Sequence, residues 1–260
     1  MMIIDSNAYI GHWAFRRLRY NAGDTILELM DRAGIDQACV SSASAIMYRN
    51  SHAGNEELLE EIEPHRDRLI PFAVLNPAYA GWRRDLQWCR DTLGARGLRL
   101  HPSYHMYALN DACCHELVDA ATELGMLVSI AALYSVADIR QRHWLVDPPD
   151  VPLQDIAWLV AEHPDARFVV HAGDSSGSDL VQKADELPAN YWLDMAFMDP
   201  LYHKGLQTVK DRIGAERLVF GTSICFRYPE SALVRMEALQ ATDEEKESIY
   251  NGNMLALLGQ

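Results

Sequence analysis

The stretch Met2-Ile3-Ile4-Asp5-Ser6-Asn7-Ala8-Tyr9 opens the chain, and it decides which fold the remaining segments can build. Its apolar run ends in Asp5, which is typical of a buried strand that stops at a polar edge. Alternate side chains of an extended strand point to the same side. We therefore expect Asp5, Asn7 and Tyr9 to share one face at the strand end, where they can converge on one site.

Further apolar runs of strand length follow, separated by amphipathic stretches of helix length. This alternation is typical of βα units that assemble a parallel sheet. The eight predicted strands are residues 2–5, 37–41, 69–75, 95–100, 127–131, 167–171, 191–195 and 217–221. Apolar spacings of three and four residues predict helices over 25–33, 56–63, 114–124 and 153–163. Gly34 and Gly125 are expected to end the first and third of these helices.

The composition fits a protein with one domain and a substantial core. The chain has 260 residues, 49% of them hydrophobic, and no linker or repeat divides residues 1–260. A net charge of −14 argues against nucleic acid as a partner, because phosphate binding relies on clustered Lys and Arg. The densest basic run, residues 16–19, is either a surface or subunit contact or a grip for an anionic ligand.

The sequence also indicates the cellular compartment. No apolar segment approaches the roughly 18–20 residues of a membrane helix, and the first residues lack the features of a secretory signal. Five cysteines make an odd number without a Cys-x-x-Cys pair, which favours a reducing environment. We expect a cytoplasmic protein without a membrane partner. Structural roles are predicted for four of the cysteines, which are Cys39, Cys89, Cys113 and Cys114.

Three later segments add a family resemblance to the first strand. His171 ends a buried run, Phe220-Gly221-Thr222-Ser223 ends another, and residues 250–258 form a closing helix. Together these segments resemble the amidohydrolase-related (amidohydrolase 2) branch of the metal-dependent hydrolase superfamily, over nearly the whole chain. The resemblance implies an α/β fold, a single-domain (β/α)8 TIM barrel, with its site at the carboxyl ends of the strands. Residues 134–152 would form a loop over the barrel mouth.

The same resemblance locates the family's metal and catalytic positions. It implies Asp-x-His-x-His in strand one, His at the ends of strands five and six, and Asp after strand eight. These positions fall on Asn7, Tyr9, Ala131, His171 and Ser223, so only His171 keeps its residue type. A catalytic zinc needs about three protein ligands among His, Cys, Asp and Glu. We therefore predict a site without a metal or other cofactor.

Candidate catalytic residues are those placed at the strand ends with acid, base or hydrogen-bonding groups. His171 is predicted to be an acid/base or orienting imidazole, although a structural histidine fits the pattern as well. Tyr9 is a hydrogen-bond donor or an acid, or it merely lines the pocket, and Asn7 offers a neutral oxygen. The predicted substrate-binding residues are Asp5, Arg99, His101, His105, Asp194, Ser223, Cys225 and Arg227.

Several of these residues have alternative roles. Arg99 and Arg227 are candidate anchors for a carboxylate, or partners of Asp5 or Asp194 inside the barrel. Cys225 lies beside an arginine and is a candidate thiolate nucleophile. His101, His105 and Asp174 are candidate replacement metal ligands.

Three classes of function follow. The first is a metal-independent hydrolase or lyase that binds a small carboxylate- or carbonyl-bearing metabolite. The second is a non-catalytic binding protein or the partner of an active paralogue, and a homo-oligomer is compatible with either. The third is a metal-dependent hydrolase with relocated ligands.

Overall fold

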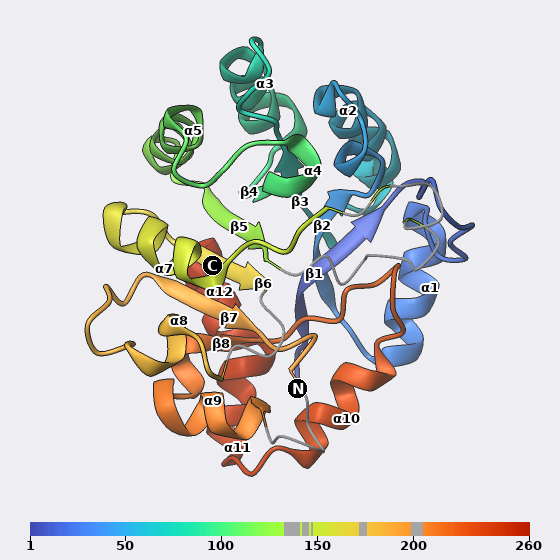
Figure 1. Ribbon diagram of the computed structural model, residues 1–260. Helices are drawn as coiled ribbons and strands as arrows, with labels where there is room; N and C mark the ends of the chain where they lie inside the picture. Colours follow the sequence, from blue (N-terminus) through green and yellow to red (C-terminus); the bar gives the residue numbers. More distant parts are fainter. Residues whose placement is uncertain (133–140, 142–145, 147, 172–175, 199–204) are drawn as a thin grey trace.

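The computed structural model describes residues 1–132, 141, 146, 148–171, 176–198 and 205–260. Eight strands form one sheet in chain order, and every neighbouring pair is parallel (Figure 1). The strands are β1 (Ile4–Ile10), β2 (Gln37–Ser42), β3 (Leu69–Val74), β4 (Gly97–Leu100), β5 (Leu127–Ala131), β6 (Phe168–His171), β7 (Tyr191–Asp194) and β8 (Leu218–Val219).

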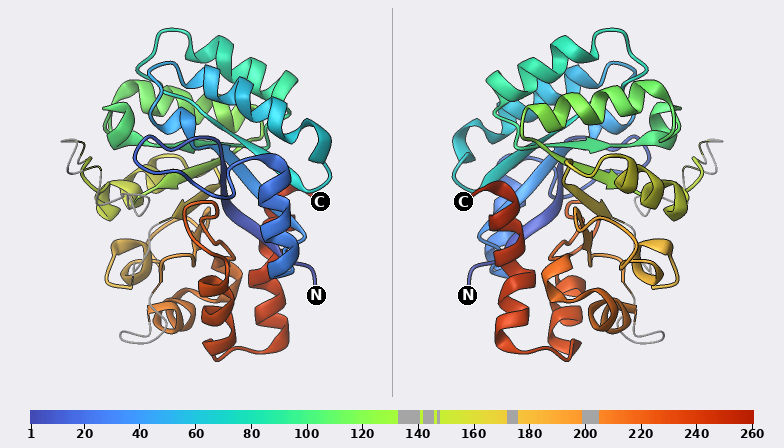
Figure 2. Two further views of the ribbon diagram at one scale, coloured as in Figure 1. Left: turned by 90° about the vertical axis from the view of Figure 1, so that its right-hand side faces the viewer. Right: turned by 90° about the vertical axis from the view of Figure 1, so that its left-hand side faces the viewer.

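Helices surround the sheet on its outer side, and both chain termini lie at the same end of the molecule (Figures 1 and 2). No helix in the described ranges is long and apolar enough to cross a membrane. The α-helices are α1 (Gly23–Ala33), α2 (Ser51–Ile62), α3 (Trp82–Trp88), α4 (Pro102–His105), α5 (Ala112–Glu123), α7 (Leu153–Glu162), α8 (Asp179–Gln182), α9 (Gly205–Ile213), α10 (Glu230–Ala238), α11 (Asp243–Glu247) and α12 (Asn253–Leu258). Short 3₁₀ and π turns are η1 (Ser44–Ile46), η2 (Glu63–His65), η3 (Cys89–Leu93), η4 (Ala215–Arg217) and η5 (Ser248–Gly252).

The sheet curls until its first strand meets the segment that follows its last. Ser6 N donates to Phe220 O at 2.9 Å, and Tyr9 N donates to Ile224 O at 2.6 Å. A parallel bridge between Ala8 and Ile224 extends this seam. The single-domain (β/α)8 barrel that the sequence predicts is thereby confirmed.

Strand one is the element whose bounds were predicted least well. The other seven strands begin and end within two residues of the prediction, but β1 runs to Ile10 instead of ending at Asp5. All seven of its residues are buried, including polar ones, so a polar residue did not mark a strand end here. A register shift between Asp5 and Ala8 also breaks the simple alternation expected of Asp5, Asn7 and Tyr9.

Other local predictions are confirmed. Gly34 and Gly125 follow α1 and α5 with φ of +69°, a left-handed conformation that glycine adopts without strain. Asn50 begins α2 earlier than predicted, because its side chain accepts a hydrogen bond from His52 N. All five cysteines are free, and of the four predicted to be structural only Cys113 is not fully buried. The loop predicted over 134–152 lies largely outside the described residues.

The amino-terminal end of the barrel is filled by apolar side chains. Phe72 on β3 points into the barrel toward β4, where Gly97 leaves room for it. A Cβ atom on Gly97 would lie 2.2 Å from Cε1 of the Phe72 ring. Residues that pack with Phe72 in this layer are Cys39, Leu127, Val169, Val219, Met254, Leu257 and Leu258. Because the described side chains fill this end, we expect a ligand to reach the polar groups further along the strands from the carboxyl side.

Substituting Gly97 by Ala should destabilise the barrel, because the added methyl group overlaps the Phe72 ring. We expect the free energy of unfolding to fall by about 1–3 kcal/mol, measured by urea denaturation. Gly177→Ala is the matched control, since its Cβ would meet no atom within 4 Å. An unchanged midpoint for Gly97→Ala would contradict this packing.

Candidate functional site

Arg99 lies at the centre of the barrel, on β4, with its side chain fully buried. Its Nη1 donates to Asn7 Oδ1 at 3.3 Å and to Ala8 O at 3.2 Å, and its Nη2 donates to Ser6 O at 3.0 Å. The guanidinium also stacks 4.8 Å from the Tyr9 ring centroid. It forms no ion pair with any described carboxylate, and its Nε has no partner among the described residues. The alternative in which Arg99 pairs with Asp5 or Asp194 is therefore wrong, and its role as an anchor for a carboxylate stays a prediction.

His101 lies just beyond β4, and its buried ring has no hydrogen-bond partner among the described residues. Both of its ring nitrogens lack a hydrogen bond in the described part of the chain, and the residue is 1% exposed. Burial, His105 and Arg99 hold its pKa well below the usual range, so the ring is neutral at pH 7. A buried neutral imidazole with two unpaired nitrogens is available to a ligand. His105 is different, because its Nε2 already contacts Ala45 O at 3.2 Å.

His171 lies in a hydrogen-bonded chain across three neighbouring strands. Its Nδ1 is 2.6 Å from Asp194 Oδ2 on β7, and its Nε2 is 2.6 Å from Ser129 Oγ on β5. Burial lowers the pKa of His171, although Asp194 acts in the opposite direction. Gly221 leaves the space that the Asp194 carboxylate occupies, since a Cβ there would lie 2.2 Å from Asp194 Oδ2. His171 is thus fixed in orientation by its two neighbours.

Asp5 lies at the seam of the barrel and is fully buried. Its Oδ1 accepts hydrogen bonds from Asn7 N at 2.9 Å and Thr222 N at 3.0 Å, and its Oδ2 accepts one from the Thr222 hydroxyl. Burial nevertheless raises the pKa of Asp5 to about 7, against 3.8 for an ordinary aspartate. Asp5 thereby joins β1 to the segment after β8, so its role in the described structure is to hold the seam. A backbone hydrogen bond from Ser223 N to Asn7 O, at 2.8 Å, lies beside it.

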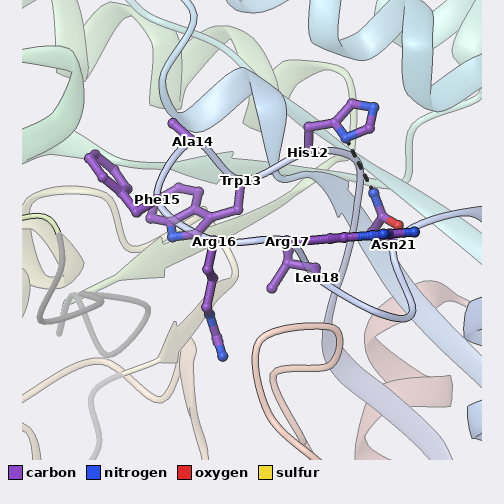
Figure 3. A pocket seen from close by; sticks show the side chains of 8 residues that line it. All are labelled: His12, Trp13, Ala14, Phe15, Arg16, Arg17, Leu18 and Asn21. Carbon is purple, nitrogen blue, oxygen red and sulfur yellow. Dashed lines mark hydrogen bonds between the residues drawn. The ribbon is translucent and has the colours of Figure 1, made fainter.

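An aromatic group covers the Tyr9 side of the site. The rings of Trp13 and Tyr9 each lie edge-on to Phe226, with centroids 5.1 Å apart in both pairs. Burial raises the pKa of Tyr9, so its phenol stays protonated and can donate a hydrogen bond, but it is not an acid with a lowered pKa. The loop after β1 that carries Trp13 also forms a pocket of about 530 Å³ (Figure 3). Arg16 reaches from this loop to Phe226 O at 2.7 Å, so one arginine of the basic run has a structural contact.

Two predicted roles at the end of β8 are corrected by the structure. Burial raises the pKa of Cys225 to about 12, so it is a thiol and its candidate role as a thiolate nucleophile is wrong. Its predicted contact with the substrate stays a prediction. Arg227 is exposed, and its guanidinium stacks 4.1 Å from the Phe197 ring centroid instead of pointing at Asp5 or Asp194. Asp174, predicted to be an alternative metal ligand, lies outside the described residues.

The metal positions implied by the resemblance can be tested against their contacts. Asn7 is bound to the cation of Arg99, Tyr9 stacks on the same cation, and both nitrogens of His171 are engaged by protein groups. Within the described ranges, no three His, Cys, Asp or Glu side chains are grouped so that they could hold a metal ion. These described donors therefore do not fit a catalytic zinc or manganese ion.

Sequence reasoning missed the two hydroxyl residues that complete this arrangement. Ser129 lies in the middle of Leu127–Ala131, and Thr222 precedes Ser223. The available signal was a polar residue inside an apolar strand, because a buried hydroxyl requires a hydrogen-bond partner. The partner of such a hydroxyl lies on a neighbouring strand that is distant in the chain. The partners of Ser129 and Thr222 could therefore not be predicted from the sequence.

The raised pKa of Asp5 predicts a pH-dependent stability that Asp5→Asn should remove. The folded protein holds this proton more tightly than the unfolded chain, so stability falls as pH rises from about 4 to about 7. Asn can keep the two backbone hydrogen bonds on Oδ1 without a charge, and its Nδ2 can donate to the Thr222 hydroxyl in place of the bond that Asp5 accepts. The variant should therefore gain stability relative to the wild type across this range, by about 4 kcal/mol at most. Urea denaturation at each pH measures the difference, and a constant offset from pH 4 to 8 would contradict the prediction.

Comparison with solved structures supports the fold. The chain is similar to 2,6-dihydroxybenzoate decarboxylase from Rhizobium, at 18% identity and a TM-score of 0.73, covering 99% of this chain and 98% of that one. It is similar to a dihydroxybenzoic acid decarboxylase from Polaromonas sp. JS666 with bound manganese and 2-nitroresorcinol, at 19% identity and a TM-score of 0.73, covering 99% and 97%. It is also similar to 5-carboxyvanillate decarboxylase from Sphingomonas paucimobilis, at 13% identity and a TM-score of 0.72, covering 99% of both chains.

No curated protein shows significant sequence similarity to the chain. The model of the amidohydrolase family, however, matches residues 11–260, which is most of the chain. The match includes seven of the eight strands in full and all of the helices described above. This protein belongs to the amidohydrolase family.

Proposed function

We propose that the barrel binds a small carboxylate- or carbonyl-bearing metabolite at the carboxyl ends of its strands and acts on it as a lyase or hydrolase. The observation that carries this proposal is Arg99, a fully buried cation without an ion-pair partner in the described ranges. A buried charge without a partner costs several kcal/mol, and an anionic ligand would supply the missing partner. The solved structures with a similar barrel include decarboxylases of aromatic carboxylates, which supports a carboxylate as the ligand.

His101 is the second group proposed to contact the ligand. Its ring nitrogens are unpaired among the described residues. His101 directly follows the last residue of β4, so it lies nearer the mouth of the barrel than Arg99 does. A neutral imidazole can donate one hydrogen bond and accept another, so it can orient a hydroxyl or carbonyl group of the ligand. Tyr9 adds a protonated phenol over the same guanidinium.

The proposed chemistry uses acid/base and electrostatic groups of this chain. Arg99 would stabilise negative charge that develops on the substrate, and His171, held by Asp194, would take or return a proton through Ser129. We further propose that the protein acts in the cytoplasm, which its five free cysteines support.

A ligand panel tests this function. Hydroxylated benzoates should bind, whereas the phenols that lack only the carboxylate should bind at least about 10-fold more weakly, because the charged contact to Arg99 is missing. Isothermal titration calorimetry measures the affinities, and product analysis for released CO₂ or hydrolysis separates a lyase from a hydrolase. Equal affinity for the acids and the phenols would contradict the proposal, and binding without turnover would favour a non-catalytic binding protein.

Arg99→Lys and Arg99→Met should weaken benzoate binding by roughly 10- to 100-fold, since each removes the guanidinium fork and Met also removes the charge. Arg83→Met is the matched control, because Arg83 is a surface residue that stacks on Trp82 and pairs with Glu116. Circular dichroism checks that each variant is folded. Unchanged affinity in both folded Arg99 variants would exclude Arg99 as the anchor.

A further inference from the structure

Three side chains in the barrel form a hydrogen-bonded series with a defined direction. Ser129, His171 and Asp194 come from the adjacent strands β5, β6 and β7, and each is no more than 3% exposed. Ser129 Oγ lies 2.6 Å from His171 Nε2, and His171 Nδ1 lies 2.6 Å from Asp194 Oδ2. Both distances are those of strong hydrogen bonds, so the series is continuous.

The chemistry of the groups fixes the proton positions. A carboxylate only accepts hydrogen bonds, so His171 Nδ1 carries the proton that Asp194 receives. Nε2 of the neutral ring is then the acceptor, and the Ser129 hydroxyl donates to it. Asp194 is itself held by Ala196 N, which donates to its Oδ1 at 2.5 Å. Nucleophile, base and orienting carboxylate thus stand in the order that activates a serine hydroxyl.

The neighbours of Ser129 provide positive charge and a small side chain on the side of the barrel mouth. Arg99 and Ser129 are partners in the register of β4 and β5, so their side chains lie side by side on the inner face. The unpaired Nε of Arg99 supplies an N–H donor there. Ala131, two residues nearer the mouth on the same face of β5, presents only a methyl group and is 7% exposed. An acyl group entering from the mouth meets no bulky side chain of β5 before Ser129.

We propose that Ser129 is the nucleophile of an acyl-transfer reaction, with His171 as its general base and Asp194 as a positioning residue. The substrate class is a small ester or amide whose acid product is the carboxylate that Arg99 holds. This inference rests on the proposed function, because it assigns the hydrolase chemistry to the same site.

Each step balances. Ser129 Oγ forms a bond to the acyl carbon, its proton passes to His171 Nε2, and the carbonyl oxygen takes negative charge facing Arg99. The bond to the leaving alcohol or amine then breaks, and His171 returns the proton to that group. Water next attacks the acyl carbon and gives a proton to His171 Nε2. The bond from the acyl carbon to Ser129 Oγ then breaks, His171 returns that proton to Oγ, and the carboxylic acid is released.

Covalent labelling with diisopropyl fluorophosphate tests the proposal without any known substrate. The serine oxygen displaces fluoride from phosphorus, so intact-mass and peptide mass spectrometry report both the adduct and its position. We expect one adduct per chain, on Ser129, absent in Ser129→Ala and formed at least about 100-fold more slowly in Asp194→Asn. Ser41→Ala is the matched control, because Ser41 is a fully buried strand serine without a histidine partner. It should label like the wild type.

Two further measurements separate the possible outcomes. The wild type should show a strongly deshielded proton resonance for the His171–Asp194 hydrogen bond, which Asp194→Asn should lose while the protein stays folded. Benzoate should protect Ser129 from the reagent. Folded protein that binds benzoate but gives no adduct on Ser129 would overturn the nucleophile and leave the proposed function standing. An adduct on Ser129 together with no carboxylate binding would overturn the proposed function instead.

Discussion

The guanidinium of Arg99, buried among oxygen atoms of β1, is the interaction on which the rest of the site depends. It binds Asn7 Oδ1 and the carbonyls of Ser6 and Ala8, so it fixes the bulged part of the first strand. Its charge lies over the Tyr9 ring and next to His101, whose pKa it helps to keep low. A positive charge in this place favours anions, and it opposes a second cation nearby.

Small residues let the polar layer form inside a tightly packed barrel. Gly97 admits the Phe72 ring that closes the floor, and Gly221 admits the Asp194 carboxylate that orients His171. Polar groups so deeply buried are stable only when they are paired, and most of this layer is. Unpaired buried atoms in the described ranges include Arg99 Nε, both nitrogens of His101, Nδ1 of His105 and Ser41 Oγ. We assign ligand contact to Arg99 and His101, because one carries a buried charge and the other has no hydrogen bond on either ring nitrogen within those ranges.

The sequence allowed the barrel, the strand order and the main polar residues to be predicted, because apolar periodicity and strand-end chemistry are local. It did not reveal how those residues pair. Arg99, expected either to anchor a carboxylate or to pair with Asp5 or Asp194, binds an amide and two carbonyls. Cys225, a candidate thiolate, is a thiol with a raised pKa. Ser129 and His171 are 42 residues apart in the chain, and only the pairing of β5 with β6 brings Ser129 Oγ within 2.6 Å of His171 Nε2.

The positive charge of this site belongs to the chain itself, since Arg99 carries it. The most direct measurement is the metal content of untagged protein grown with zinc, manganese and iron, combined with its benzoate affinity before and after chelation. We predict metal far below one ion per chain and an affinity that chelation leaves unchanged. About one ion per chain, with benzoate binding lost on its removal and restored on its return, would show that a metal ion and not Arg99 supplies the charge.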